Sequence, residues 1–261
     1  MGGETVTAGD LETVLGAVAS RVGYLRAETS VQGPEWVGCD ELIGDPTVMD
    51  TALEASLAAL GTDDMAVAAS IFAQSYAFRV AAAPLGAYAL GLPIPPAAPA
   101  AVAVRLTGGR ASGAGFRSAC LRRSGDTAGL ADELVVGHLT GFVDAVRRRV
   151  RVGTRLLWGN AAASCAAVFR ALEGAACERG EAAERQAIRR RADAFFACAP
   201  QLGRAGLFES VAAEGTEGWY WTRRSCCLWF QISGGRTCEG CSLTTADDRA
   251  AHRLAELRRR P

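Results

Sequence analysis

The sequence predicts a mostly helical α+β protein, with several amphipathic helices, a small antiparallel sheet and a C-terminal subdomain organised by cysteines. Through most of the chain, apolar residues recur at the spacing of a half-buried helix. A glycine-rich stretch between two apolar segments, within residues 101–122, indicates one hairpin. Four cysteines lie within residues 226–241, close enough in sequence to hold one C-terminal unit together.

Length and composition are those of an ordinary globular protein. A chain of 261 residues with 49% hydrophobic residues can bury a full core. The formal net charge is zero, which argues against a nucleic-acid surface, because neutralising phosphates takes an excess of basic side chains. The chain contains no lysine, a bias that we attribute to genome composition before function.

The N-terminus bears on the cellular compartment. Residues 1–6 lack a basic segment followed by an apolar one, so we expect no signal peptide and a cytoplasmic protein. In a reducing compartment, clustered cysteines indicate metal or redox chemistry. Residues 80–104 carry no charge, but prolines interrupt them repeatedly. We therefore expect a buried helix end with a proline-rich connector there, and no transmembrane segment.

The pattern divides the chain into three expected regions. Residues 1–100 form a helical region that ends in the proline-rich connector. Residues 101–215 form a hairpin and three helices. Residues 216–261 form the cysteine-bound subdomain.

Three helices are expected in the first region. Asp10 is a good N-cap for the first, which runs to Leu25. Pro46 occupies the first position of the second, which Gly61 ends. The third is capped by residues 62–64 and is expected to stop before Pro84, because proline breaks a helix interior. Between the first two helices, residues 28–44 are expected to be irregular.

The central region is expected to begin with a strand pair. Residues 101–107 and 116–122 are the strands, and the glycine-rich residues 108–115 are the loop between them. The loop lacks the Gly-Lys-Ser/Thr ending of a phosphate cradle, so a flexible turn is the preferred interpretation. Three long helices should follow, at residues 130–149, 154–172 and 181–198.

In the last region, residues 218–223 are expected as a strand that enters the cysteine run. Residues 227–232 are expected as its antiparallel partner, and the resulting aromatic sheet would cover the cysteines on one side. Residues 247–260 should form a charged final helix.

Few polar residues outside the cysteines suggest a specific role. We expect His138 to be a packed, hydrogen-bonded core residue and His252 to be exposed. Asn160 is expected to hydrogen-bond a neighbouring loop. The arginine runs 147–149 and 189–191 are interpreted as solvated charges near helix ends, with anionic-ligand binding as the minor alternative.

Four cysteines, in the pattern Cys-Cys, ten residues, Cys, two residues, Cys, can close one soft-metal site. The spacing of Cys238 and Cys241 lets two thiolates face one point. Cys226 and Cys227 are adjacent, and adjacent side chains diverge, which suits a two-iron centre slightly better than one zinc ion. Zinc, an iron–sulfur cluster and a disulfide pair all remain open on spacing alone. The five other cysteines, Cys39, Cys120, Cys165, Cys177 and Cys198, are interpreted as small buried hydrophobic residues.

The run 223–228 followed by 238–243 resembles the C-terminal signature of the FhuF-like ferric-siderophore reductases. A weaker similarity extends through residues 76–79 and 156–160. The resemblance implies a [2Fe–2S] cluster in the subdomain 216–261, held by Cys226, Cys227, Cys238 and Cys241. It also implies an oxidoreductase that reduces siderophore-bound Fe(III), often as a hydroxamate complex, to Fe(II).

Four thiolate ligands leave no open position for substrate, so such a cluster would transfer electrons. Arg223, Arg224 and Arg236 lie beside the cysteines in sequence and would raise the cluster potential or only offset the thiolate charge. Trp221 and Trp229, with these arginines, are candidates for a substrate-docking surface.

No flavin or dinucleotide fingerprint is visible, so a separate donor such as a ferredoxin or a flavoprotein reductase is expected. Two other classes of function remain as alternatives: a zinc-stabilised siderophore-binding module without redox activity, and an iron–sulfur sensor. A sensor would need a basic DNA-reading element, which the sequence does not display.

Overall fold

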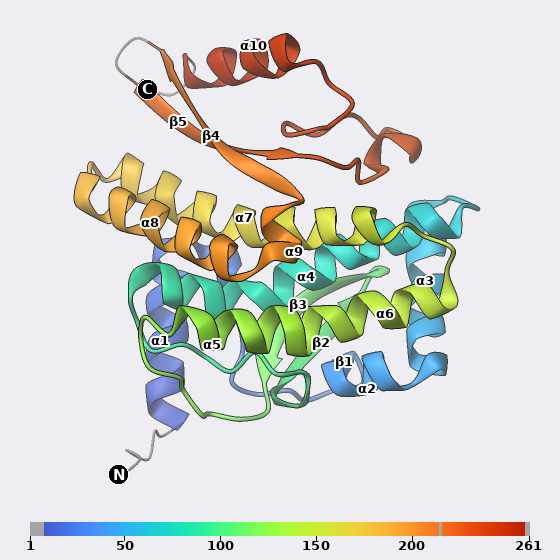
Figure 1. Ribbon diagram of the computed structural model, residues 1–261. Helices are drawn as coiled ribbons and strands as arrows, with labels where there is room; N and C mark the ends of the chain where they lie inside the picture. The colour runs from blue at the N-terminus through green and yellow to red at the C-terminus, as the bar shows by residue number, and fades with distance from the viewer. Residues whose placement is uncertain (1–7, 214–215, 259–261) are drawn as a thin grey trace.

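Long helices make up most of the protein, and the computed structural model describes residues 8–213 and 216–258 (Figure 1). The predicted fold class, mostly helical α+β, is confirmed. The helices and strands are α1 (Ala8–Arg21), η1 (Gly23–Leu25), β1 (Trp36–Gly38), α2 (Cys39–Gly44), α3 (Pro46–Leu60), α4 (Met65–Leu90), η2 (Pro99–Ala101), β2 (Val102–Thr107), β3 (Arg110–Phe116), α5 (Thr127–Ala131), η3 (Asp132–Leu139), α6 (Thr140–Arg149), α7 (Thr154–Glu178), α8 (Ala182–Cys198), α9 (Pro200–Gly203), β4 (Gly206–Ala213), β5 (Thr216–Arg223), η4 (Trp229–Gln231) and α10 (Ala246–Leu257).

Helix α4 is the central element, and α7 packs along it (Figure 1). By length and composition α4 could cross a membrane, but 61% of its most apolar stretch is buried within the protein, as in a core helix. The prediction that this helix stops before Pro84 is wrong. The helix continues to Gly91, which ends it with a left-handed φ of 74°. Pro84 removes one backbone donor, but Pro84 is itself buried, so packing offsets the loss.

Local signals located α3 correctly. The side chain of Asp45 accepts a hydrogen bond from the Thr47 amide at 2.8 Å, and Gly61 ends the helix in the left-handed region. The first helix begins earlier than predicted, so Asp10 lies in the first turn of α1 and is not its cap. Residues 28–44 are not wholly irregular, because they contain β1 and α2.

The first sheet has the order β1-β2-β3, with both pairs antiparallel. The hairpin is confirmed, but its second strand was predicted too late in the chain. Strand β3 begins at Arg110, directly after a turn in which Gly108 and Gly109 have φ values of 58° and 69°. A Cβ on Gly109 would lie 2.5 Å from the Ala55 carbonyl oxygen of α3, so glycine permits this close approach.

The helix predicted at residues 130–149 consists of α5, a π-helical segment (η3) and α6. His138 lies in η3 and is fully buried, as predicted. Its ring nitrogens lie 2.6 Å from the Tyr76 hydroxyl and 2.6 Å from the Ala97 carbonyl oxygen. Burial lowers the pKa of His138 to about 4, so the ring is neutral at pH 7.

The second sheet is the hairpin of β4 and β5, which lies on top of α7 and α8 in Figure 1. The predicted strand at residues 218–223 is confirmed, but its predicted partner at residues 227–232 is wrong, because β4 takes that place. One hairpin face carries an aromatic layer: Phe208 stacks on Trp219 at 3.9 Å between ring centroids, and Trp221 packs on Phe196 at 4.8 Å.

The final helix, α10, covers the other face of this hairpin and confirms the charged helix predicted at residues 247–260, of which 259–260 lie outside the described residues. Its Arg253 is 3% exposed. The guanidinium donates to Glu209 at 2.8 Å and to the Thr222 hydroxyl at 2.7 Å. The hairpin is therefore held between α10 on one side and α7 and α8 on the other.

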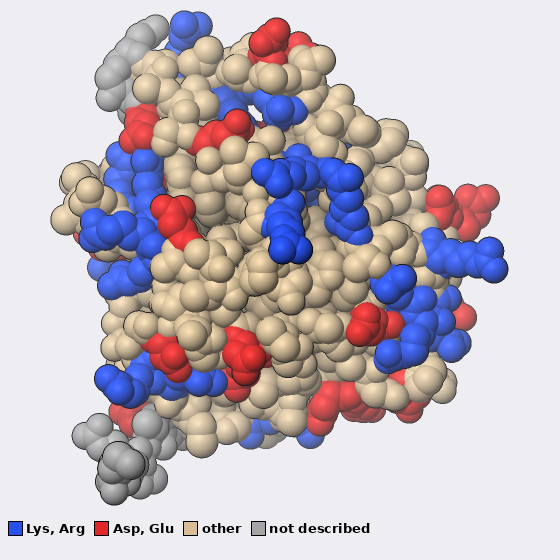
Figure 2. Space-filling model, in the orientation of Figure 1, with Lys and Arg blue, Asp and Glu red and all other residues tan. Residues whose placement is uncertain are grey.

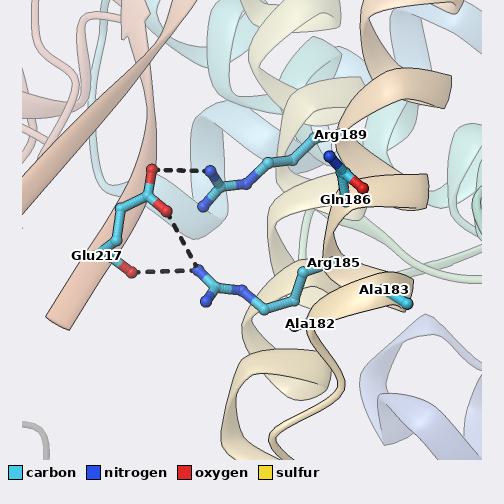
Figure 3. A pocket seen from close by; sticks show the side chains of 6 residues that line it. All are labelled: Ala182, Ala183, Arg185, Gln186, Arg189 and Glu217. Carbon is cyan, nitrogen blue, oxygen red and sulfur yellow. Dashed lines mark hydrogen bonds and ion pairs between the residues drawn. The ribbon is translucent and has the colours of Figure 1, made fainter. Parts of the chain in front are cut away.

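Ion pairs to Glu217 of β5 fasten the hairpin to α8 (Figure 3). Arg185 and Arg189 of α8 both donate to Glu173 of α7, whose side chain is 5% exposed. Arg189 also pairs with Glu217 of β5 at 2.9 Å. Arg189 is therefore held in ion pairs, and the interpretation of its arginine run as solvated charges is wrong for this residue. The hollow lined by these residues carries arginines that are already neutralised, so we do not assign it a ligand.

The aromatic core around α7 generates a stability prediction. Phe169 is fully buried, with ring centroids 6.3 Å from Tyr88 and 6.0 Å from Phe195. We expect Phe169→Ala to lower the free energy of unfolding by about 3–5 kcal/mol, through lost burial and a cavity. Urea unfolding followed by circular dichroism measures this change. Phe230→Ala is the control, because Phe230 is 40% exposed. Equal losses in the two variants would contradict the assigned core.

Candidate metal centre

The four clustered cysteines lie in the segment that joins β5 to α10, which we call the cysteine loop (residues 224–245). Cys227 and Cys241 are 4% and 2% exposed, whereas Cys226 and Cys238 are half-buried. The loop therefore has two thiols turned inward and two near the surface. All four are free thiols.

The thiols meet in pairs across the loop. Cys227 hydrogen-bonds with Cys238, and Cys226 hydrogen-bonds with Cys241. The thiol of Cys238 holds the pKa of Cys227 below its usual range, and the charge of Arg223 acts in the same direction. Burial raises the pKa of Cys226. Each pair joins one cysteine of the Cys-Cys half to one cysteine of the Cys-x-x-Cys half.

Backbone amides point at three of the sulfur atoms. The Leu228 amide lies 3.3 Å from Cys226 Sγ, and the Leu243 amide lies 3.4 Å from Cys241 Sγ. The Trp229 amide donates to Cys227. Among the described residues, Leu228 is the only non-glycine residue with a positive φ, and its φ is 64°. This left-handed residue turns the chain directly after the cysteine pair, so that two successive amides face sulfur.

The end of β5 supports the Cys-x-x-Cys half. The Arg223 amide donates to the Gly240 carbonyl at 3.0 Å, and the Cys241 amide donates to the Cys238 carbonyl at 3.0 Å. A Cβ on Gly240 would lie 2.2 Å from the Trp221 carbonyl oxygen. Glycine at position 240 therefore lets this turn lie directly against the strand.

A buried polar network ties the Cys-Cys half to the helical core. Asn160 of α7 donates to the Ser70 carbonyl of α4 at 2.7 Å, and the Ser70 hydroxyl donates to the Cys227 carbonyl at 2.7 Å. The Arg223 guanidinium donates to the Asn160 side-chain oxygen and, at 3.3 Å, to the Ser225 carbonyl. Ser70 and Asn160 are fully buried and Arg223 is 5% exposed. Asn160 forms hydrogen bonds to neighbouring elements, but its partners are Ser70 of α4 and Arg223 at the end of β5, and not a loop as predicted.

Gly159 lets the cysteine loop rest on α7. A Cβ at this position would lie 1.9 Å from Ser225 Oγ, which donates to the Arg155 carbonyl at 3.2 Å. The Gly159-Asn160 pair therefore forms a contact site for the loop: the glycine supplies room and the asparagine supplies hydrogen bonds.

The remaining predicted site residues fall into two groups. Trp221 and Arg223 are buried, so neither can shape an exposed docking surface as predicted. Arg224, Trp229 and Arg236 are exposed along the cysteine loop. Burial places Arg223 next to sulfur, where its charge acts on Cys227 and Cys238, which fits its predicted alternative role in tuning the site.

The other cysteines divide by location. Cys39 and Cys165 are fully buried, as predicted, and burial raises the pKa of each to about 12. Cys177 is half-buried, and the prediction of burial is wrong for the exposed Cys120 and Cys198. His252 is exposed, as predicted.

The donor set fits a two-iron centre. The four thiols act on one another across the loop, and four thiolates can hold a cluster with two metal atoms, each of which takes two of them. Amide donors directed at sulfur stabilise the negative charge that such a centre carries.

The contact at Gly159 generates a prediction about the loop. We expect Gly159→Ala to displace the cysteine loop, because the added methyl group overlaps Ser225. Trypsin should then cleave faster after Arg224 and Arg236, as followed by mass spectrometry. Gly174→Ala, in the same helix, is the matched control, because a Cβ there meets nothing within 4 Å. The contact would be unimportant if both variants were digested at the wild-type rate.

Comparison with known proteins identifies the C-terminal segment. Residues 223–243 match the family model described as FhuF 2Fe-2S C-terminal domain. The match includes all four cysteines of the loop, with the spacing of the signature. A comparison with curated proteins found no match. The cysteine loop therefore matches a FhuF-type [2Fe–2S] domain, and this segment supports the similarity to the FhuF-like family.

Proposed function

We propose that this protein is a ferric-siderophore reductase, in which Cys226, Cys227, Cys238 and Cys241 hold the [2Fe–2S] cluster. The observation that carries the proposal is the FhuF-type domain, whose four thiols meet in two pairs with amide donors directed at sulfur. The two half-buried thiols of Cys226 and Cys238 give the site an edge near solvent. The expected location is the cytoplasm.

When bound, a [2Fe–2S] cluster supplies reversible one-electron transfer. The net reaction moves one electron from a reduced donor to chelated Fe(III), and the products are oxidised donor, Fe(II) and the free siderophore. Hard oxygen ligands hold Fe(III) far more tightly than Fe(II), so this single electron is sufficient to release the metal. No bond to the protein is formed or broken.

The protein's own residues hold the Cys227 backbone in place and put a positive charge beside the cysteines. Asn160 and Ser70 fix the backbone of Cys227, and the same asparagine holds the Arg223 guanidinium. A buried positive charge beside sulfur favours the more negative, reduced form of the site, so Arg223 raises the reduction potential. Because Arg223 is buried, solvent screens this effect only weakly.

An exposed arginine group beside the loop suits an acidic electron donor. Arg155 donates to the Arg224 carbonyl at 2.9 Å, and Arg224 donates to the Arg204 carbonyl at 3.2 Å, so the three lie together. Figure 2 shows basic side chains gathered on this face, over α9 and the start of α7. Trp229 and Phe230, 41% and 40% exposed, add apolar surface on the same loop. A ferredoxin fits this face better than a neutral flavoprotein reductase.

The two alternative functions are less well supported. A zinc-stabilised binding module is disfavoured because the family model that matches the loop describes a 2Fe-2S domain. An iron–sulfur sensor would require a DNA-reading element, and the net charge of zero does not favour one.

Removal of one thiol tests both the ligands and the function. We expect Cys238→Ser to lose iron, acid-labile sulfide and visible absorbance, and to stop the release of Fe(II) from a ferric siderophore. Anaerobic purification, elemental analysis and trapping of Fe(II) with ferrozine measure these losses. Cys198→Ser is the control, because this exposed thiol lies outside the loop. Full iron content and activity in Cys238→Ser would refute the ligand assignment, and a colourless zinc-containing wild type would refute the reductase.

Charge reversal tests the donor face. We expect Arg204→Glu to slow electron transfer from an acidic [2Fe–2S] ferredoxin several-fold at low salt, because it opposes electrostatic attraction. Stopped-flow absorbance measures the second-order rate constant, and the difference should shrink as salt is added. Arg148→Glu, an exposed arginine of α6, is the control. Identical rates in both variants would exclude this face.

A further inference from the structure

A second arginine group lines a cavity of about 240 Å³ between η1, α4 and the β2–β3 hairpin. Its polar wall consists of Tyr24, Arg26, Glu28, Arg79, Arg105 and Ser112. These residues come from four separate segments of the chain, so only the fold brings them together.

The cavity carries unbalanced positive charge. Arg105 pairs with Glu28 at 3.3 Å and lies over the Trp36 ring at 5.4 Å. Arg79 donates to the Tyr24 carbonyl at 3.1 Å, and among the described residues neither Arg79 nor Arg26 has a carboxylate within ion-pair distance. One carboxylate therefore faces three guanidinium groups.

The arginines also act on one another. Burial lowers the pKa of Arg79, and the charges of Arg105, Arg26 and Arg110 lower it further. Like charges held together at a half-buried site repel unless an anion joins them. This contrasts with the hollow in Figure 3, whose arginines already have carboxylate partners.

Elements that border the cavity also reach the cysteine loop. At the rim of the cavity, burial raises the pKa of Tyr24, and the positive charge of Arg170 opposes this increase. Arg170 pairs with Glu239, between Cys238 and Cys241, at 3.0 Å. Helix α4 runs from the loop to the cavity: Ser70 contacts Cys227, and Arg79 lies nine residues further on, on the opposite side of the helix. Nine residues span about 14 Å of helix.

We propose that this cavity binds the negatively charged rim of the ferric chelate, so that the preferred substrate is an anionic complex of the catecholate or carboxylate type. The inference rests on the reductase proposal and names its substrate class. Three catecholates leave Fe(III) with a net charge of −3, whereas three hydroxamates leave it neutral. Guanidinium groups bind such anionic oxygens through paired hydrogen bonds. The preference differs from the hydroxamate expected from the family resemblance.

Binding of a redox-inert analogue tests the site. Ga(III) has the charge and nearly the size of Fe(III) but is not reduced under the same conditions. Isothermal titration calorimetry on the cluster-loaded protein would compare the Ga(III) complexes of a tris-catecholate and a tris-hydroxamate. We expect tighter binding of the catecholate complex, and at least about tenfold weaker binding of it in Arg79→Gln and in Arg26→Gln.

Two variants of the cavity and one control variant test the inference. Arg26 is exposed, and in the described part of the chain its guanidinium forms no hydrogen bond or ion pair, so Arg26→Gln should fold normally even if Arg79→Gln does not. Arg148→Gln should bind both complexes as the wild type does. Unchanged affinity in Arg26→Gln and in any folded Arg79→Gln would overturn the inference. Equal affinity of the wild type for the two complexes would also overturn it.

A parallel measurement separates this inference from the reductase proposal. Dithionite-reduced wild type is mixed with excess ferric catecholate or ferric hydroxamate, and reoxidation is followed by absorbance. If reoxidation occurs but the arginine variants bind gallium complexes normally, the cavity assignment fails and the reductase stands. If neither chelate reoxidises the protein, the reductase fails, and the inference falls with it.

Discussion

The guanidinium of Arg223 is buried at the point where β5 ends and the cysteine loop begins. A buried charge without hydrogen bonds would be costly, and Asn160 together with the Ser225 carbonyl satisfies it here. The same asparagine holds Ser70, which holds the backbone of Cys227. One network therefore joins α4, α7 and the cysteine loop. Because it needs all three parts in place, it fixes the loop relative to the core.

The loop itself is built from backbone geometry. The left-handed conformation of Leu228 turns successive amides toward sulfur, and Gly240 allows the second half of the loop to lie on β5. These features bring each thiol of the Cys-Cys half against one thiol of the Cys-x-x-Cys half. A FhuF-type [2Fe–2S] domain of only 21 matched residues thus depends on a helical body for its shape.

Arginine has distinct roles in a chain that has no other strong cation. Arg185, Arg189 and Arg253 are neutralised by glutamates and hold the β4–β5 hairpin between helices. Arg204 and Arg224 remain exposed beside the cysteine loop. The guanidinium groups of the η1–α4 cavity outnumber their carboxylate. Ion pairing with a carboxylate therefore distinguishes the arginines that hold the structure together from those available to a partner or ligand.

Several features could be predicted from the sequence because their causes are local. Asp45, Pro46 and Gly61 determine the ends of α3, and the spacing of the four cysteines predicts a metal centre and, by resemblance, its type. The small antiparallel hairpin was expected for the same reason, since its two glycines suit a tight turn. The burial of His138 followed from its position on an apolar helix face.

Other features were decided only by the tertiary structure. Helix α4 continues through Pro84 because packing offsets the lost hydrogen bond. Ser70 meets Asn160 across 90 residues, and Asn160 meets Arg223 across 63. No local pattern encodes such contacts. The sequence by itself determined helix ends, turns and the cysteine centre, whereas the anchoring network and the arginine cavity exist only where distant segments pack together.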